Sequence, residues 1–265
     1  MTKPPDGDVP LPAGRMTGGI VRRGGEVRRP TGPWSPAVHE YLRHLEGVGF
    51  RGAPRLVAVE EGVEVLTYLE GEVAADPGWE PGRGHRLPAA ARSEGALRSV
   101  ARLIRELHDA SRDFHPAVTS YRFHPHPPGP GEIVCHGDLG PWNTVYRQGV
   151  AYGLIDWDAC RPMNPVTDLA GAAWAYVPLV PPSRLRDTGF DPLPDLARRL
   201  RIFVDAYGLE DRRQVLPALK RAQLMGAELV KHWPVDAAGA AASLRHHAAD
   251  LEWLQSAMTD LADGL

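Results

Sequence analysis

The stretch EIVCHGDLGPWNTVYRQGVAYGLIDWDACR, residues 132–161, decides the fold of this chain. It begins with an apolar approach, crosses a tight loop and continues as two short runs rich in β-branched and aromatic residues, 144–146 and 150–155. Two such runs separated by a short turn that contains Gly149 are typical of a β-hairpin. The stretch therefore predicts a loop that leads directly into a two-stranded antiparallel element.

The register of this hairpin brings two polar side chains toward one point. A turn centred on residues 148–149 places Asn143 opposite Leu154. Asp156 follows two residues later, roughly 7 Å further at about 3.3 Å per strand residue. Mg²⁺ takes oxygen ligands and is commonly held by one or two protein groups plus phosphate oxygens. The spacing of Asn143 and Asp156 therefore predicts a site for a metal–nucleotide complex.

The order of polar residues in the stretch carries a family resemblance. HGDLGPWN (136–143) followed by LIDWD (154–158) is similar to the catalytic and metal-binding motifs of the aminoglycoside phosphotransferase and choline kinase-like family, relatives of protein kinases. The resemblance implies an α+β, two-lobed protein kinase-like fold, with a small antiparallel β-sheet N-lobe and a mostly helical C-lobe. It also implies that Asp138 is the catalytic base and that Asn143 and Asp156 hold Mg²⁺.

Two further residues, His136 and Asp168, are predicted to support this motif. His136 is interpreted as a loop-positioning hydrogen-bond partner, with Asp138 as the base. The resemblance makes Asp168 a support for the catalytic loop, while its local chemistry also fits a cap on the helix that contains residues 169–176. Asp158 ranks below Asp156 as a metal ligand, because strand alternation is unreliable beyond the end of a hairpin.

The N-terminal part of the chain predicts a first hairpin. Residues 19–23 and 26–29 flank a Gly-Gly turn. Neither this region nor its surroundings match a phosphate-loop fingerprint. The related family places a strand lysine on the phosphates, and here Arg29 lies on the same strand face as Val27. Two interpretations of Arg29 stay open: it binds nucleotide phosphate, or it is a solvated strand charge.

A helix is predicted next, over residues 35–49, with Ser35 as its cap. An apolar stripe of Val38, Tyr41, Leu42 and Leu45 supports this prediction. In the family, a helix glutamate pairs with the strand cation. Glu40 falls nearly opposite the apolar stripe, whereas His39 and Glu46 flank it at 100° per residue. The pairing partner of Arg29 is therefore left unassigned.

Two more strands, 55–59 and 63–69, are predicted around a glycine-containing turn. The segment that follows occupies the place where the related fold passes from the small lobe to the large one. By resemblance, backbone groups around Leu69 and Gly71 bind the adenine ring. An ordinary connection between lobes fits these residues equally well.

The predicted division of the chain is an N-terminal nucleotide-binding lobe over residues 1–70 and a helical C-terminal lobe over residues 71–265. Residues 1–14 are rich in Pro and Gly and are predicted to be a mobile tail or an irregular first strand. Residues 74–92 are predicted to be a surface loop, and the histidines of the Pro-rich segment 115–131 are assigned to a loop because they lack metal-ligand spacing. Helical periodicity predicts further helices over residues 94–109, 196–207, 211–233 and 237–261.

Composition limits the classes of partner. The net charge is −3 and the pI about 6.4, so the chain lacks the overall positive charge that is typical of nucleic-acid-binding proteins. It lacks a secretion signal and an apolar run long enough to span a membrane, which predicts a cytoplasmic protein without a membrane partner. In that compartment Cys135 and Cys160 are expected to be reduced packing residues. The oligomeric state is open.

The predicted function is transfer of the γ-phosphoryl group of ATP, or GTP, to a hydroxyl of a small molecule. The acceptor is an antibiotic such as an aminoglycoside, or a metabolite alcohol, and an aminoglycoside would require an acidic pocket. The alternative is a non-catalytic or weakly catalytic nucleotide-binding protein with an immunity or regulatory role. The short N-terminal lobe and the arginine in place of the expected lysine motivate that alternative.

Overall fold

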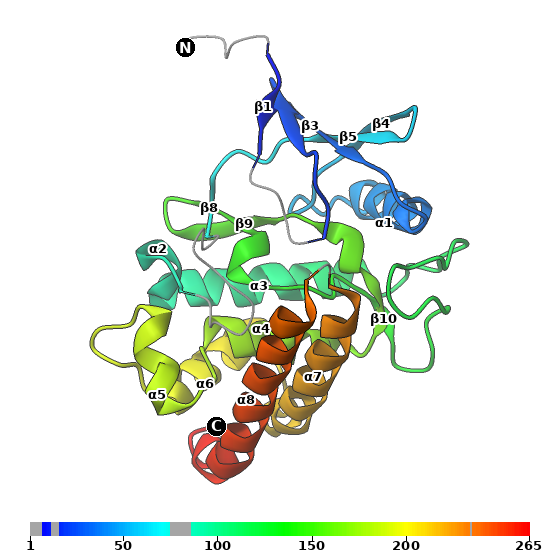
Figure 1. Ribbon diagram of the computed structural model, residues 1–265. Coiled ribbons are helices and arrows are strands. Elements are labelled where there is room, and N and C mark those ends of the chain that lie inside the picture. The colour runs from blue at the N-terminus through cyan, green and yellow to red at the C-terminus, as the bar shows by residue number, and fades with distance from the viewer. Residues whose placement is uncertain (1–6, 12–15, 75–85, 234) are drawn as a thin grey trace.

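The chain folds into a β-sheet lobe and a mostly helical lobe, as the computed structural model in Figure 1 shows. The structure describes residues 7–11, 16–74, 86–233 and 235–265. The β-sheet lobe carries helix α1 on one side, and most of the helices lie at the opposite end of the molecule (Figure 1). The predicted α+β, two-lobed architecture is confirmed.

The N-terminal sheet is antiparallel, with the strand order β1-β2-β3-β5-β4. Both predicted hairpins form, the first around Gly24, whose positive φ of 60° suits a residue without a Cβ. Residues 9–10 supply the outermost strand, while most of the predicted tail lies outside the described residues. The strands are β1 (Val9–Pro10), β2 (Val21–Arg23), β3 (Glu26–Pro30), β4 (Leu56–Glu60) and β5 (Val63–Thr67).

Helix α1 (Ser35–Gly47) buries the predicted apolar stripe, but the predicted cap is wrong. Ser35 is the first helical residue, and its Oγ accepts a hydrogen bond from the backbone N–H of Gly32 at 2.9 Å. Trp34 occupies the N-cap position without a side-chain cap. A Cβ on Gly32 would lie 2.5 Å from the Trp34 ring, so a larger residue here would require that ring to shift.

The helical lobe is built around α3 (Glu94–Ala110), which was predicted almost to the residue. The segment 211–233, predicted as a single helix, forms a 3-10 turn, an α-helix and a second 3-10 turn. Of the predicted loop 74–92, residues 89–92 form a short helix, and residues 75–85 lie outside the described part of the chain. The helices of this lobe are α2 (Ala89–Arg92), α3, α4 (Pro165–Tyr176), α5 (Pro182–Leu185), η3 (Arg186–Thr188), α6 (Leu196–Tyr207), η4 (Arg212–Gln214), α7 (Val215–Leu229), η5 (Val230–His232) and α8 (Ala237–Asp263).

Two small sheets hold the central stretch between the lobes. β7 (Ile133–Cys135) pairs with β10 (Arg161–Met163), and β8 (Thr144–Arg147) pairs with both β6 (Glu72–Val73) and β9 (Val150–Leu154). Because β6 follows Gly71 and pairs with a strand of the helical lobe, the chain joins that lobe immediately after the connection. The proposed boundary between residues 70 and 71 stays a prediction.

Among the described residues, no helix is both long and apolar enough to cross a membrane. The cytoplasmic location stays a prediction. Both cysteines are free and buried, in agreement with their assignment as reduced packing residues.

Candidate active site

Asp138 and Asn143 are joined directly within the loop between β7 and β8. The Asn143 side-chain amide donates to the Asp138 carboxylate at 2.8 Å and to the Asp138 backbone carbonyl at 2.9 Å. The Trp142 indole N–H lies 3.4 Å from both carboxylate oxygens. These donors come from η1 (Pro141–Asn143), a single 3-10 turn. They fix the direction of the Asp138 carboxylate.

The hairpin brings Asn143 nearer to Asp156 than predicted. The turn at residues 148–149 has positive φ at both positions, 52° and 76°, and forms as expected. A bulge then shifts the register, so that Thr144 and not Asn143 lies opposite Leu154. The Asn143 carbonyl accepts a hydrogen bond from the Ile155 N–H at 2.9 Å. The predicted register was wrong by one residue, because the bulged strand inserts one unpaired residue.

Asp156 adopts a left-handed backbone conformation, with φ 60° and ψ 70°, which Asp tolerates better than most residues. This turn ends the strand and begins η2 (Trp157–Ala159), where Asp158 lies. Burial raises the pKa of Asp156 to about 6, Arg29 opposes this shift, and the neighbouring Asp158 and Asp138 reinforce it. The side chain still exposes 38% of its surface. An accessible carboxylate whose charge is incompletely neutralised suits a divalent cation.

The residues fit a Mg²⁺ site by their donor set. The Asn143 amide nitrogen is used by Asp138, which leaves its oxygen as the group for a cation. Asp156 supplies a carboxylate on the adjoining segment. Both are hard oxygen ligands, and two such groups are the usual protein contribution when phosphate oxygens complete the shell.

His136 and Asp168 hold the loop from below. Burial lowers the pKa of His136, whose Nδ1 accepts from the Asp138 N–H at 3.3 Å and whose Nε2 donates to the Ile155 carbonyl at 3.1 Å. Asp168 accepts from the Gly137 N–H at 3.1 Å and lies 3.1 Å from the His108 ring. Both side chains lie where they support the loop. The predicted capping role of Asp168 is wrong, since Asn164 is the N-cap of α4.

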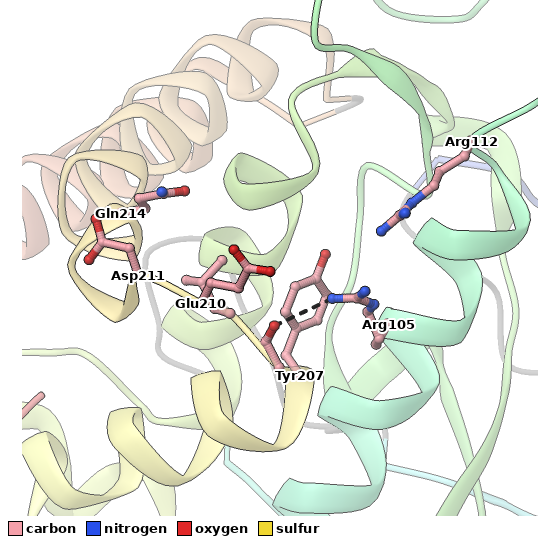
Figure 2. A pocket seen from close by; sticks show the side chains of 8 residues that line it. Arg105, Arg112, Tyr207, Glu210, Asp211 and Gln214 are labelled. Carbon is pink, nitrogen blue, oxygen red and sulfur yellow. Dashed lines mark hydrogen bonds between the residues drawn. The ribbon is translucent and has the colours of Figure 1, made fainter.

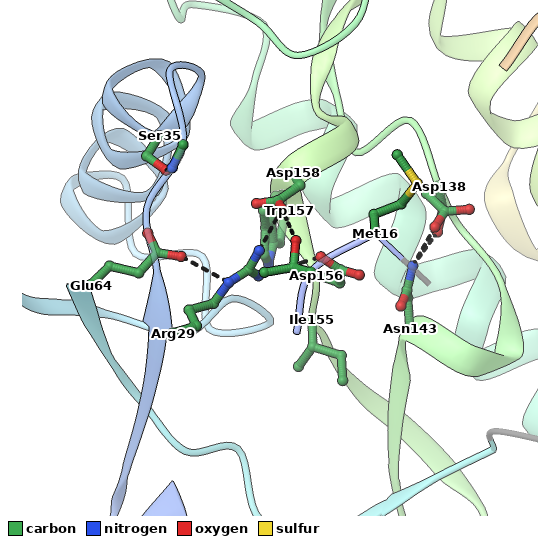
Figure 3. A network of polar contacts seen from close by, with 12 residues as sticks. Met16, Arg29, Ser35, Glu64, Asp138, Asn143, Ile155, Asp156, Trp157 and Asp158 are labelled. Atoms are coloured by element: carbon green, nitrogen blue, oxygen red, sulfur yellow. Dashed lines mark hydrogen bonds and ion pairs between the residues drawn. The ribbon is translucent and has the colours of Figure 1, made fainter. Parts of the chain in front are cut away.

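Figure 3 shows that Arg29 lies among three carboxylates. Its guanidinium is 3.1 Å from Glu64, 3.3 Å from Asp156 and 2.5 Å from Asp158. Only 6% of Arg29 is exposed, which excludes a solvated strand charge. Burial lowers the pKa of Arg29, but the three carboxylates outweigh this effect and keep it above its ordinary value.

The glutamate partner of Arg29 comes from a strand and not from helix α1. Glu64 lies on β5 directly opposite Arg29 on β3, and is 2% exposed. Helix α1 contributes His39, whose Nε2 is 2.5 Å from the Glu64 carboxylate. Glu40 instead accepts from the backbone N–H groups of residues 117 and 118, at 2.8 Å each. A charged residue within the apolar run VEVLT was the available signal for Glu64.

The connection at Leu69 and Gly71 is tightly packed. The Tyr68 N–H donates to the Gly25 carbonyl at 2.8 Å, and the Glu70 carbonyl accepts from Arg147 at 2.8 Å. A Cβ on Gly71 would lie 2.5 Å from the Tyr146 carbonyl oxygen. The adenine-binding role of Leu69 and Gly71 stays a prediction.

One pocket lies away from these residues, and one cluster of possible metal ligands lies beneath the loop. A shallow pocket of about 280 Å³, drawn in Figure 2, lies between α3 and the segment after α6 and is lined by Arg105, Tyr207 and Glu210 among others. His108, Cys135 and Asp168 place one ligand atom each within 4.8 Å of one another. All three are buried, and the His108–Asp168 contact already supports the catalytic loop.

The fold is that of the protein kinase-like phosphotransferases. Residues 119–217 match the sequence profile of the phosphotransferase enzyme family. The trifolitoxin immunity protein of Rhizobium leguminosarum bv. trifolii is 34% identical over 209 residues, which is 75% of each chain. The chain belongs to the phosphotransferase enzyme family, in agreement with the resemblance of its central motif.

Solved structures agree on the fold. A choline/ethanolamine kinase family protein from Mesorhizobium loti superposes with a TM-score of 0.57 at 17% identity, over 94% of this chain and 92% of that one. The gentamicin complex of APH(2″)-IIa gives a TM-score of 0.55 at 13% identity, over 97% and 91% of the two chains. At these identities the likeness concerns the fold.

Proposed function

We propose that the protein transfers the γ-phosphoryl group of ATP or GTP to a hydroxyl of a small molecule. The observation that carries this proposal is the continuous unit formed by Asp138, Asn143 and Asp156. The Asn143 side chain holds the Asp138 carboxylate at 2.8 Å, and its backbone bonds to Ile155, the residue before Asp156. One short segment thus supplies a positioned base beside two oxygen ligands for a cation.

In the proposed mechanism, Asp138 orients the acceptor hydroxyl and takes its proton as the phosphoryl group moves. Asn143 and Asp156 hold Mg²⁺, which would neutralise charge on the nucleotide phosphates. Arg29 reaches this site from the N-terminal lobe, and its planar guanidinium can bind a phosphate through two donors. Adenine binding is assigned to the backbone around Leu69 and Gly71.

A small molecule without several positive charges is the better candidate for the acceptor. Several acids of the helical lobe that would attract a polycation are engaged elsewhere. Asp205 pairs with Arg212, Glu228 with Lys231 and Asp250 with Arg184, while Asp211 and Asp236 are N-caps. This arrangement favours a metabolite alcohol or a neutral antibiotic over an aminoglycoside.

A second candidate function is nucleotide binding with weak or no transfer, in an immunity or regulatory role. It is supported by the ion pair between Arg29 and Asp156, which engages a proposed metal ligand with an internal cation at 3.3 Å. The relative named as a trifolitoxin immunity protein also favours it. In that case nucleotide binding would change the contacts between Arg29 and its carboxylate partners, and this change in structure would serve the regulatory role.

A thermal-shift titration with Mg–ATP and Mg–GTP, followed by transfer assays on antibiotics and metabolite alcohols, separates the two functions. Turnover of any hydroxyl acceptor, with release of the nucleoside diphosphate, supports the kinase. Stabilisation by nucleotide without turnover across the panel favours the second function. Absence of stabilisation by either nucleotide contradicts both.

A further inference from the structure

One carboxylate oxygen next to the proposed metal site collects donors from three distant segments. Asp158 Oδ2 lies 2.5 Å from Arg29 of β3, 3.0 Å from Arg122 and 3.0 Å from the Thr17 hydroxyl. Arg122 belongs to the segment between α3 and β7, and Thr17 to residues 16–20, the described part of the β1–β2 connection that leads into β2. Asp158 is 6% exposed, so these contacts form where water does not compete for the carboxylate.

Arg122 holds the β1–β2 connection by a second bond as well. Its other terminal nitrogen donates to the Met16 backbone carbonyl at 3.2 Å, and its guanidinium stacks 4.0 Å above the Trp34 ring. The Arg122 guanidinium thus contacts Asp158, the backbone of residue 16 and the ring of Trp34, the residue before α1. Residues 16 and 17 are thereby joined to the segment of Asp156 and Asp158, which Figure 3 shows together with Met16.

The segment that carries Arg122 is itself fastened to the N-terminal lobe. The Glu40 carboxylate on α1 accepts the backbone N–H groups of Ala117 and Val118, at 2.8 Å each. Helix α1 also supports the Arg29 network through His39 and Glu64. Helix α1 therefore contacts both the segment that carries Arg122 and the network that surrounds Arg29.

We propose that Arg122 and Thr17 are positioning residues that fasten residues 16–20 of the β1–β2 connection beside the nucleotide site through Asp158. The proposal rests on the proposed function. The connection lacks the glycine pattern of a phosphate loop, so its own sequence does not shape it around phosphates. When Arg29 turns toward a phosphate, Asp158 retains two donors, and the connection stays in place.

Hydrogen exchange of the nucleotide-free protein tests the fastening at the Leu11 amide, whose N–H donates to the carbonyl of Ile20, the last residue of the fastened segment, at 3.0 Å. The variants are Thr17→Val, which removes one hydroxyl, and Arg122→Met, with Arg112→Met as the control. Arg112 has an exposed ion pair with Asp109 at 2.7 Å, outside the site. A hydrogen bond to a charged group accounts for roughly a tenfold change in a local opening equilibrium, so exchange rises about tenfold in both site variants.

The affinity for Mg–ADP then tests whether these contacts strengthen nucleotide binding. Arg122→Met weakens binding by roughly threefold or more relative to Arg112→Met, because fewer molecules are binding-competent. Arg122→Lys restores only part of the affinity, because the lysine ammonium cannot donate from two nitrogens at once or stack on the Trp34 ring. Thermal unfolding of every variant confirms that the comparison is made on folded protein.

The outcomes separate this proposal from the proposed function. Exchange that is unchanged in both site variants, or that rises equally in Arg112→Met, overturns the fastening. Faster exchange with unchanged Mg–ADP affinity overturns the positioning role. If the wild type fails to bind Mg–ADP, the proposed nucleotide site is contradicted, and the exchange comparison still decides whether Asp158 holds the connection.

Discussion

Arg29 places a single guanidinium against Glu64, Asp156 and Asp158 in a site that is largely closed to water. Desolvation of such groups is costly, and it is offset only when each charge has a partner with good geometry. Arg29 has three carboxylate partners, although its Nε makes no hydrogen bond of acceptable geometry, and it links the strand of the small lobe to the proposed metal-binding segment. The same residue therefore serves the stability of the empty site and the proposed contact with phosphate.

Removing this charge is expected to destabilise the protein strongly. Arg29→Met leaves the buried Glu64 and Asp158 carboxylates with less compensation and should cost about 3 kcal/mol in the free energy of unfolding. Arg29→Lys keeps the charge but not the fork, so its loss should be smaller. Urea denaturation of the three proteins measures both values. Equal losses for the two variants would show that charge is not the stabilising feature.

At the catalytic position, Asp138→Asn is expected to abolish transfer while preserving the site. The amide is nearly isosteric and can still contact Asn143 and Trp142, but it cannot accept the hydroxyl proton. Loss of a general base typically lowers the rate by roughly 100-fold to 10,000-fold. Initial rates on an identified acceptor measure the loss, with Mg–ATP affinity as the control. Undiminished turnover would rule out Asp138 as the base.

That the motif residues lie close together could be predicted from the sequence because they belong to one short segment, while their chemical roles stay predictions. Asp138, Asn143 and Asp156 lie within 19 positions of one another, and the hairpin between them has a recognisable turn. Glu64 could not be assigned as the partner of Arg29. That pair depends on the register between β3 and β5, which are separated by a helix and another strand.

At the scale of elements, the catalytic loop depends on a close backbone approach at Gly137. Its φ is 79°, and an added Cβ would overlap the Ala159 carbonyl and the Arg161 side chain. The bulge in β9 has a similar role, because it sets which residue bonds to Asn143. A bulge was not predictable from the alternation of apolar residues, which gives the period of a strand but not its interruptions.

Two glycines with similar backbone angles should respond differently to alanine. Gly149 has φ 76° and nothing within 4 Å of an added Cβ, so Gly149→Ala should cost about 1 kcal/mol from left-handed strain alone. Gly137→Ala adds overlap with the backbone and should cost about 1–3 kcal/mol more. Thermal unfolding of the pair measures the difference. Similar stabilities would mean that the loop backbone moves freely around residue 137.

For the whole molecule, the packing of α7 against α8 predicts a dependence of stability on pH. His247 of α8 packs on Gly226 and Trp174, and burial lowers its pKa to about 4, with a smaller contribution from Arg184. A depressed folded-state pKa means that the stability is present above the unfolded pKa near 6.5 and is lost as pH falls toward about 4. At about pH 5 the loss should be roughly 2 kcal/mol.

Comparison with His247→Gln isolates this contribution from that of the carboxylates. The variant cannot take up a proton at this position, so its unfolding free energy should fall less than that of the wild type between about pH 7 and pH 5. Chemical denaturation across that range gives both curves. Parallel curves would show that His247 is not the group responsible.

The overall architecture followed from the sequence wherever an element had strong periodicity or a clear turn. Helix α3 and the first hairpin are of this kind. The segment from Asp211 to Trp233 was predicted as one helix because its apolar pattern continues, although backbone winding changes at both ends of α7. The way Asp158 joins three distant segments depends on how the lobes pack, which local patterns do not encode.

Calorimetric titration with ATP, with and without Mg²⁺, tests the central claim most directly, on the wild type, Asp156→Asn and Asp138→Asn. The account predicts that Mg²⁺ strengthens nucleotide binding to the wild type and to Asp138→Asn. In Asp156→Asn this Mg²⁺-dependent gain should fall by at least about tenfold, because a ligand of the cation has been removed. An equal gain in Asp156→Asn and the wild type, or no nucleotide binding by the wild type, would contradict the proposed site.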